Sequence, residues 1–459
     1  METFLLATAG LVALAISYAT PVKYRFLLTL TLSVFQLYMV PIGDFYISIA
    51  FAASLSLWPE VFKEARKLFK KRIFALAAIL VITQALSIIW SPDPRLGIRT
   101  IIYTLPFFFI SFAAYSIAKK DPRFIYKTLY ITCALMTVQA VLVIIFRLSP
   151  TIELGYLSSN IAGLFSGPNV IEGLMNGTEA NNIFDPDKAG GFFVNGNTAS
   201  TYLGMGAFTA YLVSKNRGSK LLFIVTLTLW VAVFFTGSKS GAMLALGLPV
   251  IALLQTKYSQ FNKRSKSALL TLSLLFLPLA IYFTSQAISS FAADSTFTTN
   301  SLDTASIRFE IWNYALSAFL ESPVFGQGFG GWQIGYGIYA ASIGIPTGFP
   351  PHNTLIYLWS QSGIITALLG IAFIYNVMKL AYVLIKSSQD EPKLVGISLG
   401  LVAGWLFIHG MGENIGLFGE PHQLPLIATL IGLAYAYKPS NRKNPKIAYE
   451  HSAYKRTNT

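Results

Sequence analysis

The sequence predicts an all-α fold, a polytopic integral membrane bundle of about 12–13 transmembrane helices with two long outer loops. The first observation is composition: of the 459 residues, 54% are hydrophobic and only 12% are charged. A water-soluble domain of this size could not cover so much apolar surface with polar residues. The second is that apolar segments of about 15–20 residues recur along the chain, long enough to cross roughly 30 Å of hydrocarbon as helices.

The apolar segments give the expected order of spans. We expect them near residues 3–20, 26–42, 45–58, 73–90, 101–118, 128–146, 198–214, 221–236, 240–255, 268–286, 354–385, 394–411 and 423–437. The first is expected to be a retained helix, because only Glu2 precedes it and no basic leader or cleavage site is visible. The break at Pro41, Gly43 and Asp44 has two interpretations, a tight hairpin or one interrupted helix.

The distribution of charge predicts the topology. With the N-terminus outside, 28 of the 34 Lys and Arg residues lie on one side of the membrane, which is the side that faces the cytoplasm in most membrane proteins. Fourteen of the 20 acidic residues lie on the other side. The net charge of +14 is therefore a topology signal, so we expect membrane lipids as partners and no nucleic acid. The six outer cations are Arg95, Arg99, Arg147, Lys188, Lys239 and Arg308.

The spans divide the chain into six parts. These are N-terminal helices over 1–146, a first long outer loop over 147–197, central helices over 198–286, a second long outer loop over 287–353, C-terminal helices over 354–437 and a basic cytoplasmic tail over 438–459. Connections as long as the two outer loops usually carry function, and their mixture of Gly, Pro and aromatic residues predicts short interfacial helices. The single cysteine, Cys133, excludes a disulfide framework and a cysteine-based zinc site.

The second long loop contains a cation beside an aromatic residue. Arg308, Trp312 and Ala315 would share one face of a short amphipathic helix, after which Pro323 and several glycines turn the chain. The same spacing also fits an interfacial helix whose long side chains only reach toward water.

Histidines mark the end of that loop and the last outer connection. His352 follows Pro351 and directly precedes a helix that we expect to begin near Leu355, so its imidazole is a candidate proton acceptor. His409 and His422 lie on either side of the last outer connection, which could close over the same site. A metal site made of His352, His422, Glu413 and Glu420 is conceivable, but no HxxxH or HExxH spacing supports it.

A third candidate is the short turn Gly237-Ser238-Lys239-Ser240 between two spans. A positive charge held at headgroup level is costly unless an anion such as a phosphate pairs with it, so Lys239 is a candidate anion ligand. His422 and the outer cation Arg99 are further candidates.

Together these features resemble the O-antigen ligase and O-antigen polymerase superfamily, whose members transfer polyprenyl-pyrophosphate-linked glycans outside the inner membrane. The resemblance covers most of the chain. It rests on five loose motifs in order, all at the predicted outer surface: Trp90-Ser91-Pro92-Asp93-Pro94, Gly191-Phe192-Phe193-Val194-Asn195-Gly196-Asn197, Thr236-Gly237-Ser238-Lys239-Ser240, the Arg308 to Gly330 stretch, and Pro351-His352-Asn353-Thr354-Leu355 with Gly363 following.

The resemblance implies roles for particular residues. The essential His of the family's ligases corresponds to His352, and an Arg earlier in the same loop corresponds to Arg308. Two positions depart from the family: Lys239 stands where Arg is common, and Lys lacks the planar fork of Arg, while Gln361 stands where many relatives have an acidic residue.

The implied enzyme is a metal-independent glycosyltransferase without a cofactor, in a bacterial inner membrane and acting on the periplasmic or extracellular face. Arg308 and Lys239 would bind the pyrophosphate, and His352 would deprotonate or orient the acceptor hydroxyl, with Asn353 fixing the imidazole. Trp312 would complete the donor-binding surface. The chain shows no P-loop or Rossmann motif.

Several functions remain open at this stage. A ligase would transfer the glycan to lipid A-core, or to protein in a related branch, whereas a polymerase would transfer it to another lipid-linked repeat. The ligase is slightly favoured, because one His in one long outer loop carries the strongest match. The alternatives from other classes are a small-anion transporter, which would need ionisable residues near mid-membrane, and a glycolipid-binding protein without catalysis.

Overall fold

The structure is a computed structural model that describes residues 19–42, 45–177, 183–184, 187–257, 299–345, 347–413 and 415–438. It confirms an all-α polytopic fold. Among the described residues, the strands are limited to one two-stranded sheet. The expected spans 3–20 and 268–286 and the basic tail beyond Lys438 lie outside the described residues.

The first described segment differs from the expected spans 26–42 and 45–58. Its elements are α2 (Val22–Ser33), β1 (Tyr38–Ile42), β2 (Phe45–Ser48), α3 (Ile49–Leu55) and α4 (Trp58–Leu68). The two strands pair antiparallel, with Ile42 opposite Phe45, so the hairpin interpretation holds and the two long spans were wrong in their bounds. Pro41 cannot donate a helical hydrogen bond, and Gln36 and Leu37 have positive φ, which ends helix α2 before the strand.

Five described helices are long and apolar enough to cross a membrane. They are α5 (Arg72–Ser87) with the 3-10 turn η1 (Ile88–Trp90), α6 (Pro94–Lys120), α7 (Pro122–Leu148), α17 (Thr354–Ile385) and α18 (Asp390–Gly410). Asp93 and Asp121 begin α6 and α7, since each side chain accepts a hydrogen bond from the first turn and a proline follows. Three further expected spans form shorter apolar helices, α12 (Lys220–Phe235), α13 (Lys239–Lys257) and α19 (Leu424–Tyr437).

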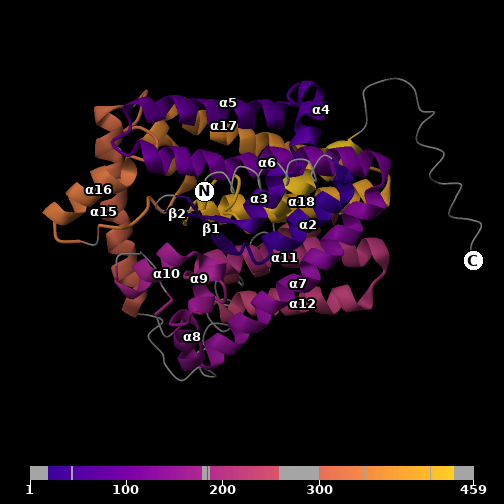
Figure 1. Cartoon of the computed structure of the whole chain (residues 1–459), viewed down its shortest axis with the longest axis horizontal. Helices are drawn as coiled ribbons and strands as arrows, with labels where there is room; N and C mark the ends of the chain where they lie inside the picture. Colours follow the sequence, from indigo (N-terminus) through magenta and orange to yellow (C-terminus); the bar gives the residue numbers. More distant parts are fainter. Residues whose placement is uncertain are drawn as a thin grey trace, which may run out of the picture.

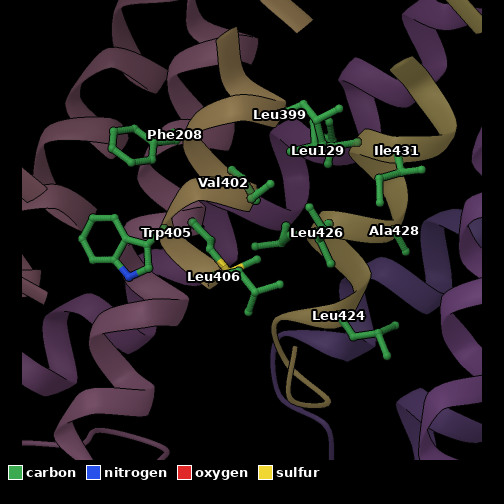
Figure 2. Close-up of a cluster of buried hydrophobic side chains, with 14 of the residues drawn as sticks. Leu129, Phe208, Leu399, Val402, Trp405, Leu406, Leu424, Leu426, Ala428 and Ile431 are labelled. Carbon is green, nitrogen blue, oxygen red and sulfur yellow. The ribbon is translucent and has the colours of Figure 1, made fainter. Parts of the chain in front are cut away.

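Helix α11 (Gly196–Arg217) lies inside the bundle, in contact with α7, α12, α13 and α18. It is rich in small and hydroxyl residues, which let the surrounding helices approach closely. A Cβ atom at Gly204 would lie 2.5 Å from the Trp405 ring, so the glycine makes room for that ring. Figure 2 shows Trp405, Phe208 and the aliphatic side chains of α18 and α19 in this buried core.

Helix α17 is broken at Gly363, which has φ 79° and ψ 175°. A Cβ there would lie 1.8 Å from the Val324 carbonyl oxygen, so only glycine fits. The expected span 354–385 is therefore two helical pieces, a short one that begins at Thr354 and a longer one after the break. Before the break, two carbonyl groups of α17 accept hydrogen bonds from the segment Gly326 to Gly330. The backbone of Gln327 donates to Ser360, and that of Gly328 donates to Gln361.

The helices of both long outer loops gather at one end of the bundle, on the left in Figure 1, which we call the loop end. The first loop forms α8 (Pro150–Leu157), α9 (Asn160–Ser166) and α10 (Pro168–Met175), and the second forms α15 (Thr299–Glu321) and α16 (Trp332–Ser342). In Figure 1 α15 runs across the ends of α5 and α17 rather than along them. Short helices were expected in both loops; those of the first loop are short, but α15, which carries Arg308, has 23 residues and was expected to be shorter. The aromatic core of Tyr314, Trp332 and Tyr336 packs α15 against α16.

Candidate active site

Arg308 lies on α15 and forms an ion pair across a large sequence separation. Its Nη2 donates to Glu413 Oε1 at 2.8 Å, although the two residues are 105 positions apart. The side chain of Glu413 is 9% exposed and that of Arg308 is 29% exposed, so the carboxylate lies deeper than the guanidinium. The Nε of Arg308 is buried and has no hydrogen-bond partner among the described residues, so one donor of the guanidinium is unsatisfied.

His352 meets the same carboxylate from the other side. Its Nδ1 lies 3.5 Å from Glu413 Oε2, which is an ion-pair distance but longer than a well-formed hydrogen bond. The Nδ1 atom is buried, so the 18% of the side chain that remains exposed belongs to other atoms of the residue. His352 also has φ 50°, in the left-handed region that non-glycine residues rarely adopt and that often marks functional sites.

The two residues after His352 fix the loop that carries Glu413. Asn353 donates from Nδ2 to the carbonyl of Met411 at 3.0 Å, while its Oδ1 caps the start of α17 by accepting from the backbone of Leu355 and Ile356. The Thr354 hydroxyl lies 3.0 Å from the carbonyl oxygen of Gly410 and 2.6 Å from that of Ile415. The loop is thus bound on both sides of Glu413.

The surroundings of Glu413 keep it ionised. Burial alone would raise the pKa of Glu413, but His352 and the charge of Arg308, with a smaller effect from His409, lower that pKa to about 2. The cluster of Arg308, Glu413 and His352, which we call the Arg–Glu–His cluster, therefore combines a fixed negative charge, an anion-binding cation and an imidazole. Such a set can bind an anion and accept a proton.

Trp312 ties α15 to this cluster. Its Nε1 donates to the carbonyl of Pro351 at 3.1 Å, directly before His352, while the residue remains 37% exposed. Ala315, expected on the same face, is buried against α16. The aromatic residue beside Arg308 therefore positions the chain at His352 and also presents a ring at the surface.

The turn with Lys239 contacts His409 of α18 and Lys188 of the first long loop. The Ser240 hydroxyl lies 2.7 Å from His409 Nε2, and the Thr201 hydroxyl lies 2.5 Å from His409 Nδ1. Both ring nitrogens of His409 are therefore engaged, and this residue ties α11, α13 and α18 together. Lys188 of the first long loop donates from Nζ to the carbonyl of Gly237 at 2.6 Å, which brings a second cation to the same turn.

The other candidates occupy different surroundings. His422 is buried, with its ring edge-on to Phe193 at 4.6 Å and Tyr202 at 5.8 Å, and burial lowers its pKa to about 3. Arg99 is exposed on α6. Gln361 is fully buried and accepts a hydrogen bond from the Gly330 backbone at 2.6 Å, so it holds the chain from Gly326 to Gly330 in place.

From the sequence, Glu413 was expected only as a conceivable metal ligand. Within the described residues there is no group of three or more His, Cys, Asp or Glu side chains that could hold a metal ion. The pairing of Glu413 with Arg308 and His352 joins three separate segments, which helical periodicity does not reveal. Lys188 was counted only as an outer charge, and its sequence neighbourhood gives no signal that it reaches Gly237.

The fold and the geometry define a polytopic membrane protein in which Arg308, Glu413 and His352 form a charged cluster at one end of the bundle. Residues 224–371 match the family model described as O-antigen ligase. This match confirms, over those residues, the resemblance to the O-antigen ligase and polymerase family. It includes Lys239, Arg308 and His352 but not Glu413. A search of curated proteins finds no match.

Proposed function

We propose that the protein transfers a glycan from a polyprenyl pyrophosphate to an acceptor hydroxyl on the outer side of a bacterial inner membrane, as an O-antigen ligase. The observation that carries the proposal is that Arg308 and His352, both within the O-antigen ligase match, converge on one buried carboxylate at the loop end. An anion site beside a proton acceptor is what this transfer requires.

In the proposed reaction the acceptor oxygen attacks the anomeric carbon of the donor sugar. The bond from that carbon to the phosphate oxygen breaks, and polyprenyl pyrophosphate leaves with the bonding electrons. The acceptor proton passes to His352, and Arg308 compensates the charge that develops on the leaving group. Lys239, with Lys188 beside its turn, adds positive charge for the second phosphate.

His352 is proposed to act through Nε2, because Nδ1 faces Glu413 and is buried. Asn353, assigned at first to fix the imidazole directly, instead has both ends of its amide engaged with the α17 backbone and Met411. Its effect on His352 would then run through the Glu413 loop. Trp312 is also proposed to bind the donor.

The proposal is tested in cells that lack the protein, complemented with the wild type or with His352→Ala. The expected result is long glycan polymer that accumulates on the polyprenyl carrier, unattached to lipid A-core, both without the protein and with the variant. Acceptors that carry only single repeats would instead identify a polymerase. Normal surface glycan with a His352→Ala protein present at wild-type levels would contradict the role of His352.

A transporter is distinguished by reconstitution. Proteoliposomes that contain the purified protein are expected to release polyprenyl pyrophosphate only when both lipid-linked glycan and acceptor are present. Uptake of a labelled small anion such as bicarbonate, without any lipid-linked glycan, would contradict the proposed enzyme. Donor binding without pyrophosphate release would identify a glycolipid-binding protein.

A further inference from the structure

We infer that Glu413 is the positioning residue of the proposed active site: its carboxylate holds the Nδ1–H tautomer of His352 and so leaves Nε2 to accept the proton of the acceptor hydroxyl. This inference rests on the proposed function, since it assigns a role within the same site. Glu413 lies outside the matched family region, in the connection between α18 and α19.

The first support is the geometry of the carboxylate. Its two oxygens face two different partners, Oε1 toward Arg308 at 2.8 Å and Oε2 toward His352 at 3.5 Å. A neutral imidazole carries its proton on one nitrogen only, and an anionic acceptor beside Nδ1 stabilises the tautomer with the proton there. Distances between catalytic partners are often long before substrate binds and shorten in the complex.

The second support is how firmly the carboxylate is held. Asn353 and Thr354 bind the carbonyls of residues 410, 411 and 415, so the same segment that presents His352 also fixes the loop with Glu413. His352 lies between Pro351 and these contacts, and its backbone is in the left-handed region, with φ 50°. Hydrogen bonds from the Asn353 and Thr354 side chains to main-chain carbonyls therefore set the imidazole and the carboxylate relative to one another.

The third support is the charge of the site. A general base that gains a proton becomes an imidazolium, and a buried carboxylate next to it stabilises that charge as it forms. The same carboxylate neutralises Arg308 until an anionic donor binds at the exposed part of its side chain. Glu413 thus acts through His352 and Arg308 and is not expected to touch the reacting carbon.

The test compares Glu413→Gln and Glu413→Asp with the wild type, using transfer rates of the purified full-length protein in detergent with lipid-linked glycan and acceptor. Glutamine keeps the shape and an oxygen for Arg308 but removes the negative charge. We expect kcat to fall about 100-fold or more with little change in the KM for the donor. The aspartate variant keeps the charge at a shorter reach, and we expect a fall of about tenfold.

The second measurement is the tautomer of His352, because a purely structural role of Glu413 would leave this tautomer unchanged. The chain has only four histidines, so ¹⁵N-histidine labelling gives few imidazole signals, and His352→Gln assigns the one of interest. We expect protonation of Nδ1 in the wild type and in Glu413→Asp, and a shift toward the Nε2–H form in Glu413→Gln. An unchanged tautomer in Glu413→Gln would overturn the inference.

The matched control is Glu420→Gln, which alters the other carboxylate of the same connection, a half-buried one. Glu420 accepts a hydrogen bond from the Gly416 backbone at 3.2 Å, a contact that glutamine can keep, so we expect wild-type kcat. If Glu413→Gln does not accumulate, the aspartate variant decides alone, and wild-type kcat in it would overturn the inference. Full activity of Glu413→Gln beside an inactive His352→Ala would reject the inference but leave the proposed function standing.

Discussion

Replacing Arg308 by lysine separates the charge of the guanidinium from its shape. The side chain of Arg308 works in two directions at once: Nη2 binds Glu413 at 2.8 Å, and Nε remains without a partner among the described residues. An ammonium group carries the same charge but offers a single donor atom, so it can face the carboxylate or the donor phosphate but not both in the same geometry. We therefore expect Arg308→Lys to lose one charge-assisted hydrogen bond in the transition state.

The size of that loss follows from the contact. A hydrogen bond to a charged group contributes about 1.5–3 kcal/mol, and about 1.4 kcal/mol corresponds to a tenfold change in rate. The expected fall in kcat/KM is thus roughly 10-fold to 150-fold. The assay measures initial rates of glycan transfer by the purified protein, with Arg95→Lys as the matched control, because Arg95 is exposed on α6. Wild-type kcat/KM in Arg308→Lys would refute the argument.

Three further predictions concern Lys239, His422 and Glu153. Lys239→Ala is expected to raise the KM for the lipid-linked donor about tenfold, while Lys239→Arg keeps the wild-type KM. Titration of the donor in the same assay measures both values. A wild-type KM in Lys239→Ala would exclude Lys239 from donor binding. His422→Phe is expected to keep full transfer activity, because the ring packs between Phe193 and Tyr202 and burial lowers its pKa to about 3; loss of activity at normal protein levels would contradict this. Burial raises the pKa of Glu153 to about 7, although the hydrogen bond from Gly190 and the charge of Arg147 act in the opposite direction. The stability that this residue contributes is therefore present below about pH 4.5 and is lost as the pH rises through about 7. Glu153→Gln should therefore unfold at a higher temperature than the wild type at pH 8 but not at pH 4.5, and equal unfolding temperatures at pH 8 would contradict the assignment.

Most of the helices could be predicted because each depends on a local property of the chain. The apolar runs that became α5, α6, α7 and α18 are long, and residues such as Asp93 and Asp121 mark where two of these helices begin. The predicted spans are wrong where tertiary contacts, and not the length of the apolar run, decide where a helix ends. The run from Phe26 onward contains enough apolar residues for a span, yet α2 ends at Ser33 and a hairpin follows.

The break in α17 shows a second limit. Gly363 lies inside an apolar run, where an isolated glycine is compatible with a continuous helix. The break exists because the chain at Val324 packs directly against it, some 40 positions earlier in the sequence. Periodicity carries no information about such a contact, so the sequence alone could not divide this span.

The proposed active site was predictable in part for the same reason. His352 and Arg308 were found because each belongs to a motif of the resembling family, and Lys239 because a cation at headgroup level is unusual. Glu413 belongs to none of these motifs, and its significance appears only when the α18–α19 connection is placed beside α15 and the start of α17. Gln361, flagged as a departure from the family, has a structural role in binding Gly330.

The proposed active site requires the loop end to face away from the cytoplasm. The only native cysteine, Cys133, is buried, so single cysteines can be introduced in a Cys133→Ala background without interference. We expect a membrane-impermeant thiol reagent, added to intact cells with a permeable outer envelope, to label Ser342→Cys at the end of α16 in the second long loop and to leave Ser388→Cys between α17 and α18 unlabelled. The reverse pattern would put His352, Arg308 and Glu413 in the cytoplasm and would contradict the proposed active site.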